Sequence, residues 1–144
     1  MDTDRGFRLL RAAFLAGAVT DALAVIPMLS PSVATALWGF KDPGGPYLLA
    51  MGSAAALMLG WTGLLVWAWQ RPLERRFIAA LTAVVIGGLA VTEIVGVLDA
   101  WVALWRVVPT LILQTVLLAL FGVAYLASAP HSADSERHVA TNSR

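Results

Sequence analysis

The sequence predicts an all-α polytopic membrane protein, a four-helix bundle with both termini in the cytoplasm. Three observations lead to this fold class: few charged residues, four long apolar segments and a one-sided distribution of arginines. Hydrophobic residues make up 59% of the 144 residues, and charged residues only 13%, against roughly 25% in an average soluble domain. A chain of this length would need more charged surface in water, so lipid is the expected solvent of its helices.

Four apolar segments set the predicted spans, at about 7–29, 47–69, 77–98 and 107–127. Each approaches or exceeds the roughly 20 residues that a helix needs to cross about 30 Å of hydrocarbon. None shows the short alternating pattern of a membrane β-barrel. We therefore expect one transmembrane domain over 1–127, packed as a left-handed bundle of four helices.

The segments between and after the spans carry turn residues or polar residues. The breaks fall at "SPS" (30–32), "KDPGGP" (41–46) and "QRPLERR" (70–76). The last segment, 128–144, is polar and aperiodic, and it predicts a disordered cytoplasmic tail.

The first apolar segment has an alternative interpretation as a signal peptide, with arginines before it and "SVA" (32–34) as a cleavage site. The length of the segment and Asp21 within it both argue against cleavage. We therefore expect it to remain as the first span.

Charge predicts the orientation of the four spans. Eight arginines fall on one side of the predicted membrane and two basic residues on the other, and basic residues favour the cytoplasmic side. An even number of spans then places both termini in the cytoplasm of a bacterial cell, with the chain crossing the inner membrane. The two groups are Arg5, Arg8, Arg11, Arg71, Arg75, Arg76, Arg137 and Arg144 inside, and Lys41 and Arg106 outside.

Polar residues from separate spans are predicted to share one depth, in the outer half of the membrane. At a rise of about 1.5 Å per residue, side chains from all four spans fall at similar heights. We call this set the outer polar layer; its members are Asp21, Ser53, Glu93, Thr110 and Gln114. We expect a neutral Glu93 to donate a hydrogen bond to Gln114 or to Asp21.

Two interpretations of this layer stay open. A charged carboxylate near the middle of the bilayer costs about 2.5–3.5 kcal/mol on insertion scales, which favours a functional site for Asp21 and Glu93. Alternatively, these residues and Gln114 are hydrogen-bonding contacts between helices. At the outer edge, Asp99 and Arg106 are candidates for a charge pair.

Other site types find little support in the residues. The chain has no cysteine, and its two histidines lie in the polar tail, so we expect no metal site and no cofactor. A net charge of +1 without a basic patch predicts no nucleic-acid partner. Trp61 is the one tryptophan away from the predicted interfaces, and packing is favoured for it over lining a pocket.

The stretch "AAALMLGWTGLLVWAWQRPLERR", residues 54–76, resembles a segment of small four-span bacterial membrane proteins that carry no assigned function. The overall plan, with acidic residues in the first and third spans, resembles the DoxX-like group. The resemblance covers the spans and not the tail. It implies a four-helix membrane bundle and no catalytic residue.

Three functions follow as hypotheses. The first is binding or transport of a small, largely apolar molecule at the outer polar layer, with a proton linkage through Glu93 and Asp21. The second is an accessory subunit that meets a second copy or a larger membrane partner through the small residues Gly52, Ala56 and Gly60. The third is a membrane-embedded isomerase or cyclase acting on a lipid, with Glu93 as general acid. Apart from membrane lipids, the residues name no partner, and they favour a non-enzymatic role over catalysis.

Overall fold

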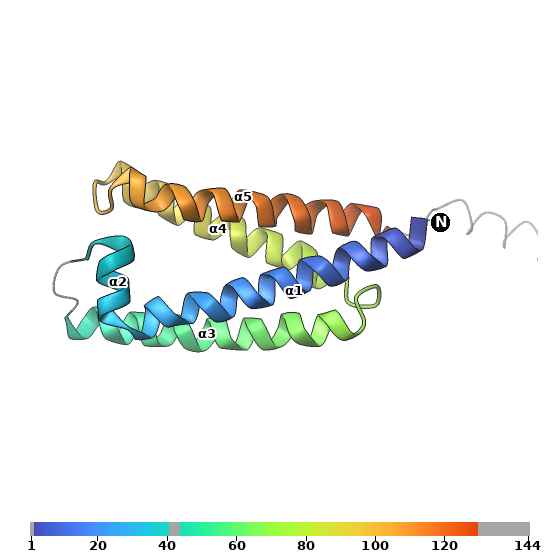
Figure 1. The fold of residues 1–144 in the computed structure, drawn as a ribbon, viewed down its shortest axis with the longest axis horizontal. Helices are drawn as coiled ribbons and strands as arrows, with labels where there is room; N and C mark the ends of the chain where they lie inside the picture. Colours follow the sequence, from blue (N-terminus) through green and yellow to red (C-terminus); the bar gives the residue numbers. More distant parts are fainter. Residues whose placement is uncertain (1, 41–43, 130–144) are drawn as a thin grey trace, which may run out of the picture.

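The computed structural model describes residues 2–40 and 44–129, and its regular secondary structure there is helical (Figure 1). Four helices are long and apolar enough to cross a membrane, which confirms the predicted all-α class and the four candidate spans. They are α1 (Asp2–Leu29), α3 (Gly45–Gln70), α4 (Phe77–Leu98) and α5 (Leu104–Ala127). Helices α1, α3 and α5 begin earlier than predicted, at Asp2, Gly45 and Leu104.

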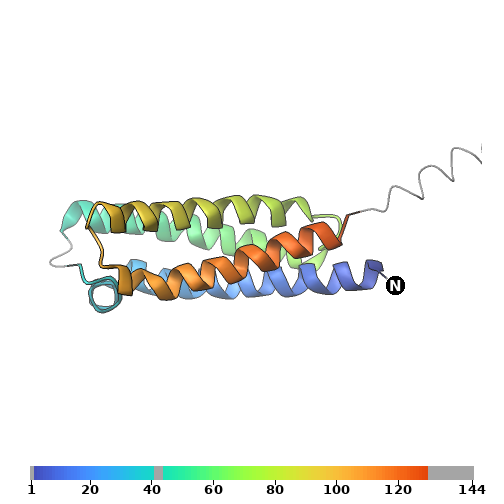
Figure 2. The ribbon, with the colours of Figure 1, turned by 90° about the horizontal axis from the view of Figure 1, so that it is seen from above.

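A short fifth helix, α2 (Pro31–Trp38), lies where the sequence predicted only a break. Pro31 takes the first helical position, where its missing N–H costs nothing. Gly39 ends the helix with φ 76°, a left-handed conformation that glycine adopts without strain. Figures 1 and 2 show α2 lying across the ends of the long helices, and its eight residues are too few to span a bilayer.

The long helices run side by side, and the described ends of the chain meet at one end of the molecule (Figures 1 and 2). We call this the terminal end; it carries the start of α1, the turn at residues 71–76 and the end of α5. A guanidinium nitrogen of Arg76 donates a hydrogen bond of 3.0 Å to the carbonyl of Ser128, which ties the turn to the end of α5. The opposite end, which we call the α2 end, carries α2 and the connection between α4 and α5.

The helices do not all pack equally. Helix α1 packs against α3 and α5, and α4 packs against α5, whereas α3 and α4 make few direct contacts. The buried core lies toward the terminal end, where the Phe14 and Phe121 rings meet edge to face with centroids 6.0 Å apart. The core residues are Leu10, Ala13, Phe14, Ala18, Leu65, Ala68, Ile78, Ala79, Ile86, Leu117, Phe121 and Ala124.

Two glycines on α1 allow α5 to approach closely. A Cβ atom on Gly6 would lie 2.7 Å from the Ala127 carbonyl oxygen, and one on Gly17 would lie 2.9 Å from the Phe121 ring. The tight packing at the terminal end therefore depends on these two positions. The core cluster does not extend to the α2 end of the long helices, and Glu93, Thr110 and Gln114 lie toward that end.

Candidate functional site

Glu93 binds two side chains of α5. The Thr110 hydroxyl donates to Glu93 Oε2 at 2.7 Å, and the Gln114 amide nitrogen donates to Glu93 Oε1 at 2.9 Å. Thr110 and Gln114 are four residues apart, so both lie on the face of α5 that packs against α4. The structure therefore brings together three members of the outer polar layer, and we call them the Glu93 network.

The Thr110 hydroxyl in this network has one hydrogen and two acceptors within reach. The Thr110 oxygen lies 2.7 Å from Glu93 Oε2 and 2.8 Å from the Val107 carbonyl oxygen, and one hydroxyl hydrogen cannot serve both. A protonated Glu93 carboxyl would supply the second hydrogen, leaving the Thr110 hydrogen for Val107. Within the described residues, Gln114 Oε1 is buried and has no hydrogen-bond partner.

Asp21 lies in a different setting. It projects from α1 and is half-buried, and within residues 2–40 and 44–129 no hydrogen bond or ion pair to its carboxyl group is formed. The predicted bond between Glu93 and Asp21 is therefore absent from the described part of the chain. The two carboxyl groups belong to separate sites.

Asp21 lines a cavity of about 290 Å³. Helix α1 contributes Gly17, Asp21 and Met28, and α5 contributes Leu117. The remaining lining residues are apolar or aromatic for the most part, and they are Ala54, Leu57, Met58 and Trp61 of α3 with Thr82, Val85, Ile86 and Leu89 of α4. The cavity thus has mostly apolar walls and one acidic lining residue, which is the usual character of a small-molecule pocket.

We infer that the cavity opens between α3 and α4. These helices make few direct contacts, and Leu57 and Leu89, which line the cavity from the two sides, are 77% and 42% exposed. In a bilayer this opening would face the lipid tails. An apolar molecule could therefore reach Asp21 from the membrane without crossing water.

Two further polar groups line the same cavity. The Thr82 hydroxyl donates to the Ile78 carbonyl at 2.7 Å, which leaves its oxygen free to accept a hydrogen bond. The indole nitrogen of Trp61 is buried without a partner in the part of the chain that the structure describes. Trp61 lines the cavity and also packs against the core, so both interpretations of this residue from the sequence apply. Thr82 was not among the predicted site residues because it falls in the inner half of its predicted span, away from the outer polar layer.

The other predicted site residues lie elsewhere. Ser53 is exposed and donates to the Leu49 carbonyl of its own helix at 3.0 Å. Asp99 is exposed, and the predicted pair of Asp99 with Arg106 is not among the ion pairs of the described residues.

Arg106 binds α2 instead of Asp99. It donates to the carbonyl oxygens of Ala36 and Leu37 at 3.1 and 3.2 Å, where the C-terminus of α2 attracts a cation. Because α2 was not predicted, its carbonyl groups could not be predicted as the partners of Arg106.

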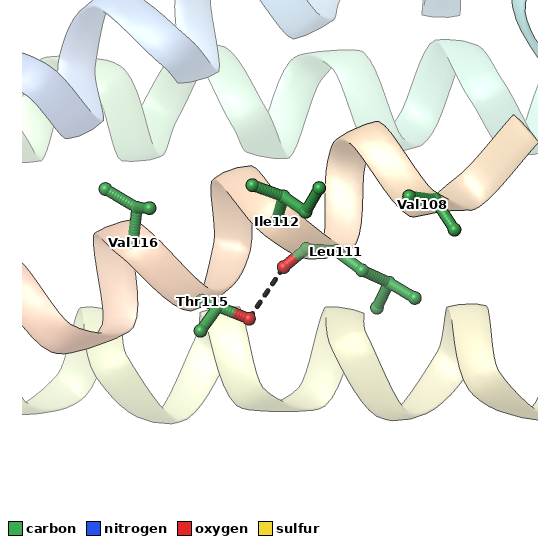
Figure 3. Close-up of a pocket in the computed structure, with 5 residues that line it drawn as sticks. All are labelled: Val108, Leu111, Ile112, Thr115 and Val116. Carbon is green, nitrogen blue, oxygen red and sulfur yellow. Dashed lines mark hydrogen bonds between the residues drawn. The ribbon is translucent and has the colours of Figure 1, made fainter.

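A second hollow lies on α5 alone (Figure 3). Val108, Leu111, Ile112, Thr115 and Val116 line it, and Figure 3 shows the Thr115 hydroxyl bonded to the Leu111 carbonyl of the preceding turn, at 2.8 Å. All five residues come from one helix, so the hollow is a depression of its surface and cannot enclose a ligand.

No group of three or more potential metal ligands occurs within the described residues. Comparison with known protein families, with curated proteins and with solved structures gave no match. The resemblance to the DoxX-like group stays a prediction, and the functional argument depends on the geometry of the cavity and the Glu93 network.

Proposed function

We propose that this chain is a multi-pass protein of the bacterial inner membrane that binds or transports a small, largely apolar molecule in the cavity beside Asp21. The observation that carries the proposal is a mostly apolar cavity of about 290 Å³ that is lined by Asp21 and by two candidate spans, α3 and α4, which make few direct contacts with each other. An intramembrane carboxyl group facing a cavity usually belongs to a substrate or proton pathway.

The proposed topology is a left-handed bundle with the terminal end in the cytoplasm. It is supported by the arginines near the start of α1 and in the turn at residues 71–76, which lie at the same end of the molecule. Basic residues of short loops favour the cytoplasmic side. In this orientation the Glu93 network and α2 lie toward the outside.

Any proton linkage in this proposal depends on Asp21 alone. Both oxygens of Glu93 are engaged by Thr110 and Gln114, which also weakens the hypothesis that Glu93 is the general acid of an isomerase or cyclase. The carboxyl of Asp21 has no such partner among the described residues, so it is the group free to exchange a proton with a ligand.

Photolabelling of the full chain in lipid nanodiscs tests the binding site. An octanol carrying a diazirine is the probe, and labelled residues are mapped by mass spectrometry. We expect saturable labelling of the lining segments of α3 and α4 around Met58 and Leu89. The variant Ala54→Leu, which fills the cavity, should abolish the saturable component.

Ala56→Leu is the matched control, because it adds the same volume to α3 at an exposed position outside the cavity. It should label like the wild type. Labelling spread evenly over the lipid-facing surface, and unchanged in Ala54→Leu, would contradict the proposal.

A second candidate function is the accessory subunit. It is supported by the face of α3 that carries Gly52, Ala56 and Gly60, because both glycines have open space where a Cβ atom would lie and Ala56 is exposed. Co-purification of a partner that survives Ala56→Gly and is lost in Gly60→Leu would support it. Gly122→Leu is the control, since a Cβ atom at Gly122 of α5 would also meet nothing within 4 Å. A monodisperse protein without a partner would count against this function.

A further inference from the structure

The carboxyl group of Asp21 has no cation within its own chain to pair with, as far as the structure describes it. The described arginines lie near the two ends of the molecule, and the nearest one along α1, Arg11, is ten residues or about 15 Å away. Arg11 is already placed over the Trp69 ring, 4.4 Å from its centroid. The described basic residues are Arg5, Arg8, Arg11, Arg71, Arg75, Arg76 and Arg106.

The surroundings of Asp21 suit a positive charge carried on an apolar body. A carboxylate among apolar walls is costly unless a cation pairs with it. The Thr82 oxygen, which has free lone pairs, adds a second acceptor to the lining, and Trp61 adds an aromatic ring of the kind that attracts cations. The remaining walls, with Met28, Met58 and Leu57, would contact hydrocarbon.

We propose that the cavity takes a small lipophilic amine in its cationic form, with the ammonium group on Asp21 and the hydrocarbon between α3 and α4. This inference rests on the proposed function and names the chemical class of its ligand. An alkyl or aryl amine with about eight to ten non-hydrogen atoms matches a volume of about 290 Å³, which corresponds to roughly ten molecules of liquid water. An alkylamine is charged at neutral pH, as a lysine side chain is.

Competition in the photolabelling assay tests the ligand class. Octylamine and octanol share one hydrocarbon body and differ in the head group, and each is titrated against the diazirine octanol. In the wild type we expect octylamine to displace the probe at an about tenfold lower concentration than octanol, the effect of a hydrogen bond to a charged group. The two compounds partition differently into lipid, so the informative quantity is the change of their ratio between variants.

Asp21→Asn should bring the two competitors to the same effective concentration after correction for partitioning, and Asp21→Glu should retain the preference for the amine. Asp99→Asn is the matched control, because it makes the same chemical change at an exposed position outside the cavity, and it should keep the wild-type ratio. A second measurement needs no variant: octylamine with a diazirine beside its nitrogen should label the α1 peptide that contains Asp21.

The two proposals fail in different ways. Saturable labelling of the cavity with an unchanged ratio in Asp21→Asn, or head-group labelling confined to other helices, overturns the amine and leaves the cavity as a site for neutral molecules. Absence of saturable labelling in the cavity by either probe overturns the proposed function itself.

Discussion

The two carboxyl groups in the apolar helices, Glu93 and Asp21, have opposite surroundings. Glu93 lies between α4 and α5 and binds Thr110 and Gln114, at 2.7 and 2.9 Å. Asp21 lines a cavity of about 290 Å³ and has no hydrogen bond within the residues that the structure describes. The first carboxyl group joins two helices, and the second faces a space that a ligand could fill.

The difference shows how the role of an intramembrane carboxyl group can be inferred from its neighbours. A polar group that is satisfied by its own chain stabilises one packing arrangement. A polar group left beside a cavity lowers stability and is expected where function requires it. Stability and binding should therefore respond in opposite ways at the two positions.

The largest effect on stability is expected from Glu93→Leu. This change removes both acceptors of the network, and it should lower the free energy of unfolding by about 1–2 kcal/mol. Reversible unfolding in mixed micelles measures the loss. Thr92→Val is the control, because the exposed Thr92 hydroxyl bonds only to the Gly88 carbonyl of its own helix, at 3.0 Å. If Glu93→Leu unfolds like Thr92→Val, the Glu93 network contributes nothing to stability, and Glu93 and Asp21 do not differ in the way described.

Asp21→Leu should not lower the free energy of unfolding, in contrast to Glu93→Leu. It removes no hydrogen bond in the described structure and adds hydrocarbon to the cavity, so we expect the free energy of unfolding to stay the same or rise by up to about 1 kcal/mol. The same unfolding assay measures it, with Asp21→Asn as the variant that changes charge and keeps shape. A loss as large as that of Glu93→Leu would mean that Asp21 also joins helices.

Part of this comparison could be predicted from the sequence. The four spans follow from length and hydropathy, and Glu93 could be placed near Gln114 because their helices are adjacent in sequence and joined by a short turn. Helix α2 was missed because eight residues between two breaks fall below the length of a span. Pro31 at its first position and Gly39 after its end were the available signals.

The position of Asp21 could not be predicted in the same way. In water, a helix shows an apolar stripe that faces the core, and the stripe indicates its neighbours. In lipid, both the packed face and the exposed face are apolar, so the sequence does not show that α1 packs on α3 and α5 while α3 stays away from α4. The cavity exists because of that arrangement. Depth along each helix could be predicted, but not the direction in which each side chain points.

Double-mutant cycles test the same difference between Glu93 and Asp21 through coupling energies, which are smaller than the effects of the single variants. Glu93→Leu and Gln114→Leu should be coupled by about 0.6 kcal/mol, the average for hydrogen bonds between membrane helices. Asp21→Leu and Gln114→Leu should add to within about 0.3–0.5 kcal/mol, because no hydrogen bond joins these residues. Equal coupling in the two cycles would mean that Asp21 and Glu93 belong to one network after all.

The smallest loss of stability within the Glu93 network, and the most specific chemical test, is expected at Thr110. Thr110→Val removes one hydroxyl and leaves the bond from Gln114 to Glu93, so the loss should be about 0.5 kcal/mol. Thr110→Ser keeps the hydroxyl and should unfold like the wild type.

Infrared spectroscopy of the same variants then tests whether the Glu93 carboxyl group is protonated. A neutral Glu93 that donates to Thr110 should give a protonated carboxyl band that shifts in Thr110→Val and is lost in Glu93→Gln. The Thr110 oxygen lies within 2.8 Å of both Glu93 Oε2 and the Val107 carbonyl and has one hydrogen to share between them, so a charged Glu93 would leave Val107 without that bond. A spectrum without a band that depends on Glu93 would show an ionised carboxylate. The Glu93 network would then hold a negative charge toward the α2 end of α4 and α5, and Glu93 would be a second carboxylate, besides Asp21, within the predicted spans.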